Sequence, residues 1–184
     1  MAVTRVSFVA GDVGQWRVEQ VRAVVGDTLP AAAALSRIES AVFQNPIDAA
    51  WSLDGVRSNE RYQEVVEKKK LASLQEDLGR PASSCAVLIP MRKSPDWWLM
   101  SQDERRTIFE HKSHHIAVGS EYLPTVARRL YHCRDLGGDF DFLTWFEFAP
   151  EGQDAFDHLL ARLRKSEEWK YVDREVELRL TRNA

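Results

Sequence analysis

The second half of the chain has an order of apolar and polar segments that few folds can accommodate. Cys85–Pro90 is a continuous apolar run, which is typical of a buried strand. Ser101 and Glu104 form a capping box, which predicts a helix that begins at Ser101 and reaches Gly119. The later segments predict two strands, an amphipathic helix and a last strand: Val126–Cys133, Phe140–Phe148, the stripe of Phe156, Leu159, Leu160 and Leu163, and Val172–Leu180. Strand, helix, strand, strand, helix, strand is the ferredoxin-like split βαβ arrangement, an antiparallel sheet with helices on one face.

The first half is less regular and predicts a reduced version of the same unit. Its expected elements are strands at Thr4–Val9, Gln15–Val25 and Ala49–Val56, a helix at Ala31–Ser40, and helical structure within Glu60–Asp77. Gly79-Arg80-Pro81 ends that helical region and is the candidate boundary between residues 1–80 and 81–184. We therefore expect an α+β fold of two ferredoxin-like units, the N-terminal one reduced, whose sheets pack on each other or close into one α+β barrel.

The composition is that of a folded chain and excludes some classes of partner. The 184 residues are 44% hydrophobic and 29% charged, with a net charge of -3, and the pI is near 6.0. There is no long block of Lys and Arg, and no apolar window near the ~18 residues that a membrane span needs. We expect a cytoplasmic protein with no nucleic-acid or membrane partner. Cys85 and Cys133 have no metal-ligand spacing and are expected to be reduced.

A cluster of histidines is the first candidate for chemistry. If the helix that begins at Ser101 is continuous, Ile108, His111 and His115 fall on one stripe and His114 is turned away. His111 and His115 could chelate zinc, but position 112 is Lys where the zinc-protease motif has Glu. A single histidine could instead be the axial ligand of a haem, held without thioether links because there is no Cys-x-x-Cys-His motif. Surface or core histidines remain the third interpretation.

Arg128 is the second candidate, because a permanent cation falls on an apolar strand face. It shares that face with Val126, Leu130 and His132. Desolvating an arginine alone costs several kcal/mol, so Arg128 needs either an anionic ligand or a carboxylate partner. Asp141 and Glu147 on the neighbouring strand are the candidates for such an ion pair.

Several of these segments together resemble one known family. They are Trp97-Trp98-Leu99-Met100-Ser101, His115, Arg128-Arg129-Leu130-Tyr131-His132 and Phe140-Asp141-Phe142-Leu143-Thr144-Trp145-Phe146-Glu147. The chain is similar to the chlorite dismutase family of haem b proteins from about Ser58-Asn59-Glu60-Arg61-Tyr62 to its C-terminus. Its length resembles the compact branch of that family, which forms homodimers. The family fold is a dimeric α+β barrel of two ferredoxin-like units, in agreement with the fold expected above.

The resemblance also implies roles for particular residues. The family's iron ligand falls on His115, because the distal arginine follows it by 13 positions, at Arg128. Glu168 matches the acceptor that hydrogen-bonds the ligand imidazole. Other matches fall beside the haem or on its distal side: Lys93, Trp97, Tyr62 and Met91 as cofactor-binding residues, and Gln75 as a distal glutamine near the arginine.

The family's reaction converts chlorite to chloride and dioxygen through a ferryl and hypochlorite pair. The resemblance implies that Arg128 holds the hypochlorite anion and that Glu168 makes the His115 imidazole a stronger donor. Two alternatives stay open within this resemblance. One is a coproheme decarboxylase or other haem peroxidase of the superfamily, and the other is a haem-binding protein without catalytic activity.

Overall fold

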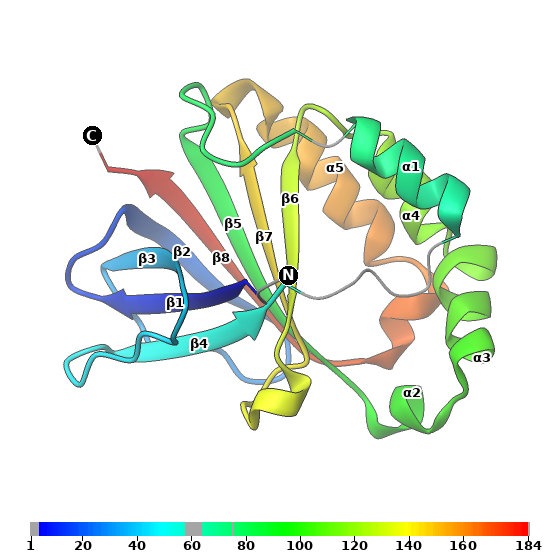
Figure 1. The fold of residues 1–184 in the computed structure, drawn as a ribbon, viewed down its shortest axis with the longest axis horizontal. Helices are drawn as coiled ribbons and strands as arrows, with labels where there is room; N and C mark the ends of the chain where they lie inside the picture. Colours follow the sequence, from blue (N-terminus) through cyan, green and yellow to red (C-terminus); the bar gives the residue numbers. More distant parts are fainter. Residues whose placement is uncertain (1–3, 58–63, 75, 184) are drawn as a thin grey trace.

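The strands of both halves close into a single barrel in the computed structural model, which describes residues 4–57, 64–74 and 76–183. Eight antiparallel strands follow each other around this barrel in the order β1-β3-β2-β8-β5-β7-β6-β4 (Figure 1). Their bounds are β1 Arg5–Gly11, β2 Trp16–Val25, β3 Ala34–Ser40, β4 Trp51–Val56, β5 Cys85–Lys93, β6 Ala127–His132, β7 Phe142–Phe148 and β8 Val172–Arg182. The seam between β2 and β8 is long, from Trp16 against Arg182 to Val25 against Glu175, whereas β4 and β6 meet only at Val56 and His132.

The two halves share one strand order and differ in their helices. The order β8-β5-β7-β6 of the second half is repeated by β4-β1-β3-β2 in the first. The helical elements of the second half are α2 Pro95–Leu99, α3 Gln102–Arg106, the π-helical turn η1 Thr107–Lys112, α4 His115–Ser120, α5 Gln153–Leu163 and the 3₁₀ turn η4 Glu167–Tyr171. Within residues 4–57 there are strands and no helix. The expected α+β barrel of two ferredoxin-like units, the first one reduced, is confirmed, while the division at residues 80 and 81 stays a prediction.

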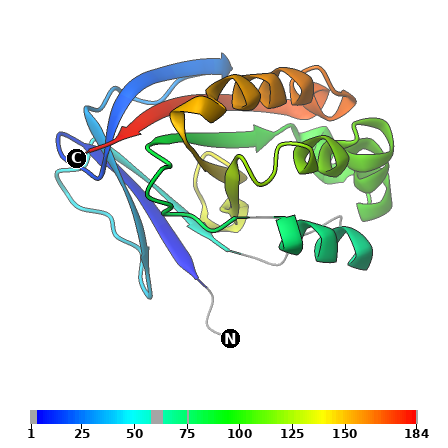
Figure 2. The same cartoon turned by 90° about the horizontal axis from the view of Figure 1, so that it is seen from above.

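The helices collect on one side of the barrel, over the outer face of β5–β8 (Figures 1 and 2). There the predicted stripe of α5 is buried, with Phe156 fully inaccessible and stacked on Phe148 at a ring-centroid distance of 4.8 Å. Helix α1 (Val65–Leu74), which lies within the predicted helical region, adds Leu71 to this layer. A second core fills the barrel itself, around Phe8 and Trp145. Each large apolar side chain buried in either core contributes roughly 1.5–3 kcal/mol, so helices and sheet are held together firmly.

One predicted element of the first half is wrong. Ala31–Ser40 was expected to be a helix, but Ala34–Ser40 is strand β3 and pairs with β1 along its whole length, from Ala34 against Gly11 to Ser40 against Arg5. The alanine run favours a helix in isolation. Closing the barrel requires a strand between β1 and β2, and the backbone hydrogen bonds on both edges outweigh that local preference.

Strand β8 buries two carboxylates on the face opposite its apolar residues. Glu175 and Glu177 are 0% and 1% exposed, and the carboxylate of Glu177 accepts hydrogen bonds from Arg22, Arg164 and Arg179. Burial alone would raise the pKa of Glu177, but these three guanidinium groups lower it to about 2. The charged face of this strand is therefore an internal ion-pair network that ties α5 to the sheet.

None of the helices among the described residues is both long and apolar enough to cross a membrane.

Candidate functional site

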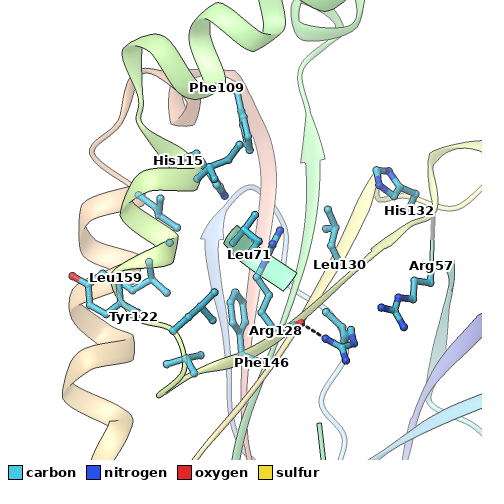
Figure 3. A pocket seen from close by; sticks show the side chains of 16 residues that line it. Arg57, Leu71, Phe109, His115, Tyr122, Arg128, Leu130, His132, Phe146 and Leu159 are labelled. Carbon is cyan, nitrogen blue, oxygen red and sulfur yellow. Dashed lines mark hydrogen bonds between the residues drawn. The ribbon is translucent and has the colours of Figure 1, made fainter. Parts of the chain in front are cut away.

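A cavity lies between the outer face of β5, β7 and β6 and the helices that cover it (Figure 3). Antiparallel pairing places Arg128 opposite Phe146 and His132 opposite Phe142, so these side chains leave the sheet on the same face. Two adjoining hollows, with about 1040 and 800 Å³ of empty space including their open mouths, share His115 and Arg128 among their walls. Most of the lining is apolar or aromatic, as in pockets that hold organic ligands.

The segment that carries the histidines is not one continuous helix. The capping box at Ser101 and Glu104 is confirmed, but the helix passes into a π turn at Thr107–Lys112 and is broken at His114, whose φ is 51°. The predicted stripe through His111 and His115 is therefore wrong. His111 and His114 are exposed, whereas His115 begins α4 and points into the cavity (Figure 3). A left-handed histidine has no sequence signal comparable to glycine, so the break could not be foreseen.

His115 is hydrogen-bonded to a buried carboxylate. Its Nδ1 lies 2.6 Å from Oε2 of Glu168, which is on the 3₁₀ turn after α5 and is 4% exposed. Because an ionised carboxylate only accepts hydrogen bonds, Nδ1 carries a proton in the neutral imidazole and Nε2 keeps its lone pair. The ring of Phe109 stacks on the imidazole at 4.4 Å between centroids and restricts its rotation. This is the arrangement of a metal-binding histidine with an oriented ring.

Lys93 forms an ion pair with the second carboxylate oxygen of Glu168. Lys93 is 4% exposed, and its ammonium lies 2.7 Å from Oε1 of Glu168. The same group lies 4.7 Å from the ring centroid of Trp97 and 5.8 Å from that of Trp169. Burial alone would raise the pKa of Glu168, but the Lys93 ammonium and the His115 imidazole hold it at about 2. The carboxylate is thus ionised at any physiological pH. Contact between Lys93 and a carboxylate of the cofactor stays a prediction, and the carboxylate seen here belongs to the protein.

Arg128 enters the same cavity from β6, on the sheet side, whereas His115 enters from α4 on the helix side (Figure 3). It shares the strand face with Leu130 and His132, as expected. Glu147 belongs to the opposite face of β7, where it accepts hydrogen bonds from Nε1 of Trp145 and the backbone N–H of Gly79. Asp141 accepts hydrogen bonds from the Lys93 backbone N–H and Nε1 of Trp98.

The remaining predicted residues divide into two groups. Met91 and Trp97 line the cavity, the latter only 1% exposed. Tyr62 and Gln75 lie outside the described residues. Sequence reasoning missed Phe109 and Trp169, which have ring contacts to His115 and Lys93 respectively. Neither has a distinguishing motif, because each reaches the site only through the tertiary fold.

Comparisons with known proteins agree with this arrangement. A family model described as chlorite dismutase matches residues 21–183. The chlorite dismutase of Ideonella dechloratans is 31% identical over 150 residues, which are 79% of this chain and 50% of that protein. The chain thus spans half the length of this curated relative.

Solved structures give the same result. The crystal structure of a dimeric chlorite dismutase from Nitrobacter winogradskyi superposes with a TM-score of 0.88 at 51% sequence identity, covering 96% of this chain and 99% of that one. A mutant chlorite dismutase from Candidatus Nitrospira defluvii in complex with cyanide has a TM-score of 0.73 at 19% identity, and the match covers 98% of this chain and 91% of that chain. At this low identity the likeness supports the fold alone. With a family model that matches nearly its whole length, the chain belongs to the chlorite dismutase family.

Proposed function

We propose that this protein is a haem b-dependent chlorite dismutase, which converts chlorite to chloride and dioxygen. The observation that carries the proposal is the placement of His115 and Arg128 on facing walls of one cavity, with Glu168 behind the imidazole. The relatives named chlorite dismutase support the same reaction.

The residues present fit a haem. Glu168 holds Nδ1 of His115, which leaves Nε2 for an iron ion, and the carboxylate makes that nitrogen a stronger donor. The apolar walls from β5, β6 and β7 suit a flat, largely apolar ring. Lys93, Trp97, Met91 and the undescribed Tyr62 are the proposed neighbours of the cofactor. When bound, haem supplies an iron centre that can take an oxygen atom from an oxyanion.

Arg128 is the proposed anion-binding residue. A guanidinium is charged at any working pH, and in an apolar cavity its attraction to an anion is much stronger than in water. It would orient chlorite on entry and keep hypochlorite in the cavity until the O–O bond has formed. The net conversion of chlorite to chloride and dioxygen transfers no proton, so no acid-base pair is required beside Arg128. Gln75 is proposed as a second distal residue.

An oxygen electrode tests this function directly. Hemin-loaded protein should release dioxygen from chlorite, and Arg128→Ala should keep its haem but lose most of the oxygen yield and bleach sooner, because hypochlorite escapes. Arg92→Ala is the matched control, since Arg92 is a half-exposed arginine whose partner is Asp173, 3.0 Å away. If Arg128→Ala turned over as fully and for as long as the control, the role of Arg128 would be wrong.

Two other results would favour the rival functions. Haem-loaded protein that releases no dioxygen at all would favour the haem carrier. Loss of porphyrin carboxyl groups on peroxide addition, seen by mass spectrometry, would favour the decarboxylase.

We also propose that the protein is a homodimer. The support is the dimeric chlorite dismutase from Nitrobacter winogradskyi, 51% identical over nearly the whole chain. Light scattering on the purified protein should give a mass of about twice 21.1 kDa. A mass of one chain at micromolar concentration would contradict this.

A further inference from the structure

The turn before His115 has an unusual backbone. Thr107–Lys112 is wound as a π helix, and the Ser113 N–H donates to the carbonyl of Ile108 at 3.1 Å. The next residue, His114, has a φ of 51°, which is uncommon for a residue other than glycine. Both features are unfavourable in isolation, and single π turns often occur next to functional sites. Contacts made by side chains of this segment must therefore hold it in place.

Glu110 is the first such contact. Helix α4 begins at His115, and His114 gives it no side-chain cap. The carboxylate of Glu110, one turn earlier, takes that place: Oε2 accepts from the Ile116 N–H at 2.7 Å and Oε1 from the Ala117 N–H at 3.3 Å. These N–H groups follow His115 directly, so the carboxylate fixes the backbone from which the imidazole projects.

Ser113 makes the second contact. It holds Glu168, whose carboxylate is the hydrogen-bond partner of the His115 imidazole. Its Oγ accepts a hydrogen bond from the backbone N–H of Glu168 at 2.8 Å, and the two residues are 7% and 4% exposed. Nothing in the sequence connects these positions, which are 55 residues apart. One short turn therefore holds His115 through Glu110 and holds Glu168 through Ser113.

We propose that Glu110 and Ser113 are positioning residues, which set the direction of the His115 imidazole and the length of its hydrogen bond to Glu168. The inference rests on the proposed function, in which Nε2 of His115 binds the haem iron. A rigid turn holding both partners keeps the carboxylate aligned with Nδ1. The alignment makes the imidazole a stronger donor and favours ferric over ferrous iron.

Four variants and one control test this. Glu110→Ala and Ser113→Ala remove the acceptors. Glu110→Gln keeps one acceptor oxygen and Ser113→Thr keeps the hydroxyl. Glu121→Ala is the matched control, because it removes a carboxylate bound to Arg162 at the other end of α4. Each protein is measured by hemin titration, by absorption and electron paramagnetic resonance of the ferric form, by its reduction potential, and by unfolding of the haem-free chain.

Both alanine variants should bind hemin about 10–100-fold more weakly, as loss of such outer contacts to metal ligands generally does. Their reduction potentials should shift upward and their ferric spectra should show a mixture of ligand geometries. Glu110→Gln, Ser113→Thr and the control should stay close to the wild type. Wild-type affinity, spectrum and potential in both alanine variants would overturn the inference. If Glu110→Ala did not fold, the comparison of Ser113→Ala with Ser113→Thr decides alone.

A different result would refute the proposed function. If His115→Ala kept the haem spectrum of the wild type, the ligand assignment itself would be wrong whatever the Glu110 and Ser113 variants did. If His115→Ala lost that spectrum while the two alanine variants matched the wild type, only the positioning roles would be refuted.

Discussion

Replacing Lys93 by methionine is the sharpest test of how the site is built. Lys93 and Glu168 are each 4% exposed, and Nζ of the lysine lies 2.7 Å from Oε1 of the glutamate. At an effective dielectric constant of 20, the attraction over that distance is about 6 kcal/mol. Most of this is offset by the loss of hydration of both ions, so the pair as a whole adds little to the stability of the fold.

Breaking the pair from one side is different, because one buried charge is left with too few partners. Lys93→Met removes the ammonium but leaves Glu168 in place, and such a change costs about 3–5 kcal/mol. The contacts of the ammonium with Trp97 and Trp169 are lost as well. For a chain of 184 residues, this predicts a fall in the melting temperature of roughly 6–20 °C.

The assay is urea unfolding of the haem-free protein in a double-mutant cycle with Glu168→Gln. The double variant contains neither charge, so it should be less destabilised than the sum of the two single variants by about 2 kcal/mol or more. Lys165→Met is the control, because Lys165 lies outside the Lys93–Glu168 pair. A loss below about 1 kcal/mol in Lys93→Met, or single effects that simply add, would refute the reasoning.

Two further predictions concern stability. Glu177 has a folded-state pKa of about 2 against an ordinary value of 4.5, so its contribution is complete above pH 4.5 and is lost as the pH falls towards 2. The unfolding free energy should drop over that range, and less steeply in Glu177→Gln; equal slopes would contradict the assignment. In Gly14→Ala the new Cβ would lie 2.7 Å from the backbone carbon of Leu35, whereas in Gly119→Ala it meets nothing within 4 Å. Gly14→Ala should therefore destabilise the fold by about 2 kcal/mol or more and Gly119→Ala should be neutral or stabilising by up to ~1 kcal/mol, as thermal unfolding will show.

The sequence predicted most of the second half because local pattern and tertiary role agree there. The apolar run at Cys85 and the stripe of α5 match the faces that are buried. Strand β8 keeps its predicted alternation, but its charged face is buried as well, because arginines pair with Glu175 and Glu177 there. The alanine-rich β3 was wrong because its strand state depends on neighbours far along the chain. Helix α2 was also missed, although Ser94 before Pro95 is a helix-start signal that could have revealed it.

The candidate site was only partly predictable. Arg128 was found as a cation on an apolar strand face, whereas the family resemblance was needed to choose His115 among three histidines and to add Glu168. The structure brings the three residues to one cavity. The ion pair of Lys93 with Glu168 could not be foreseen, because 75 residues separate them. The hydrogen bonds of Glu110 and Ser113 depend on a π turn and on a left-handed histidine. Neither of these two backbone features has a local sequence signature.

The central claim is that the imidazole of His115 binds the haem iron. Hemin titration of the wild type beside His115→Ala, followed by absorption and electron paramagnetic resonance, tests it most directly. His111→Ala and His114→Ala serve as controls because both side chains are exposed. We expect a five-coordinate ferric spectrum in the wild type and in both controls, and its loss in His115→Ala alone. A wild type that stays colourless with hemin, or an unchanged spectrum in His115→Ala, would contradict it.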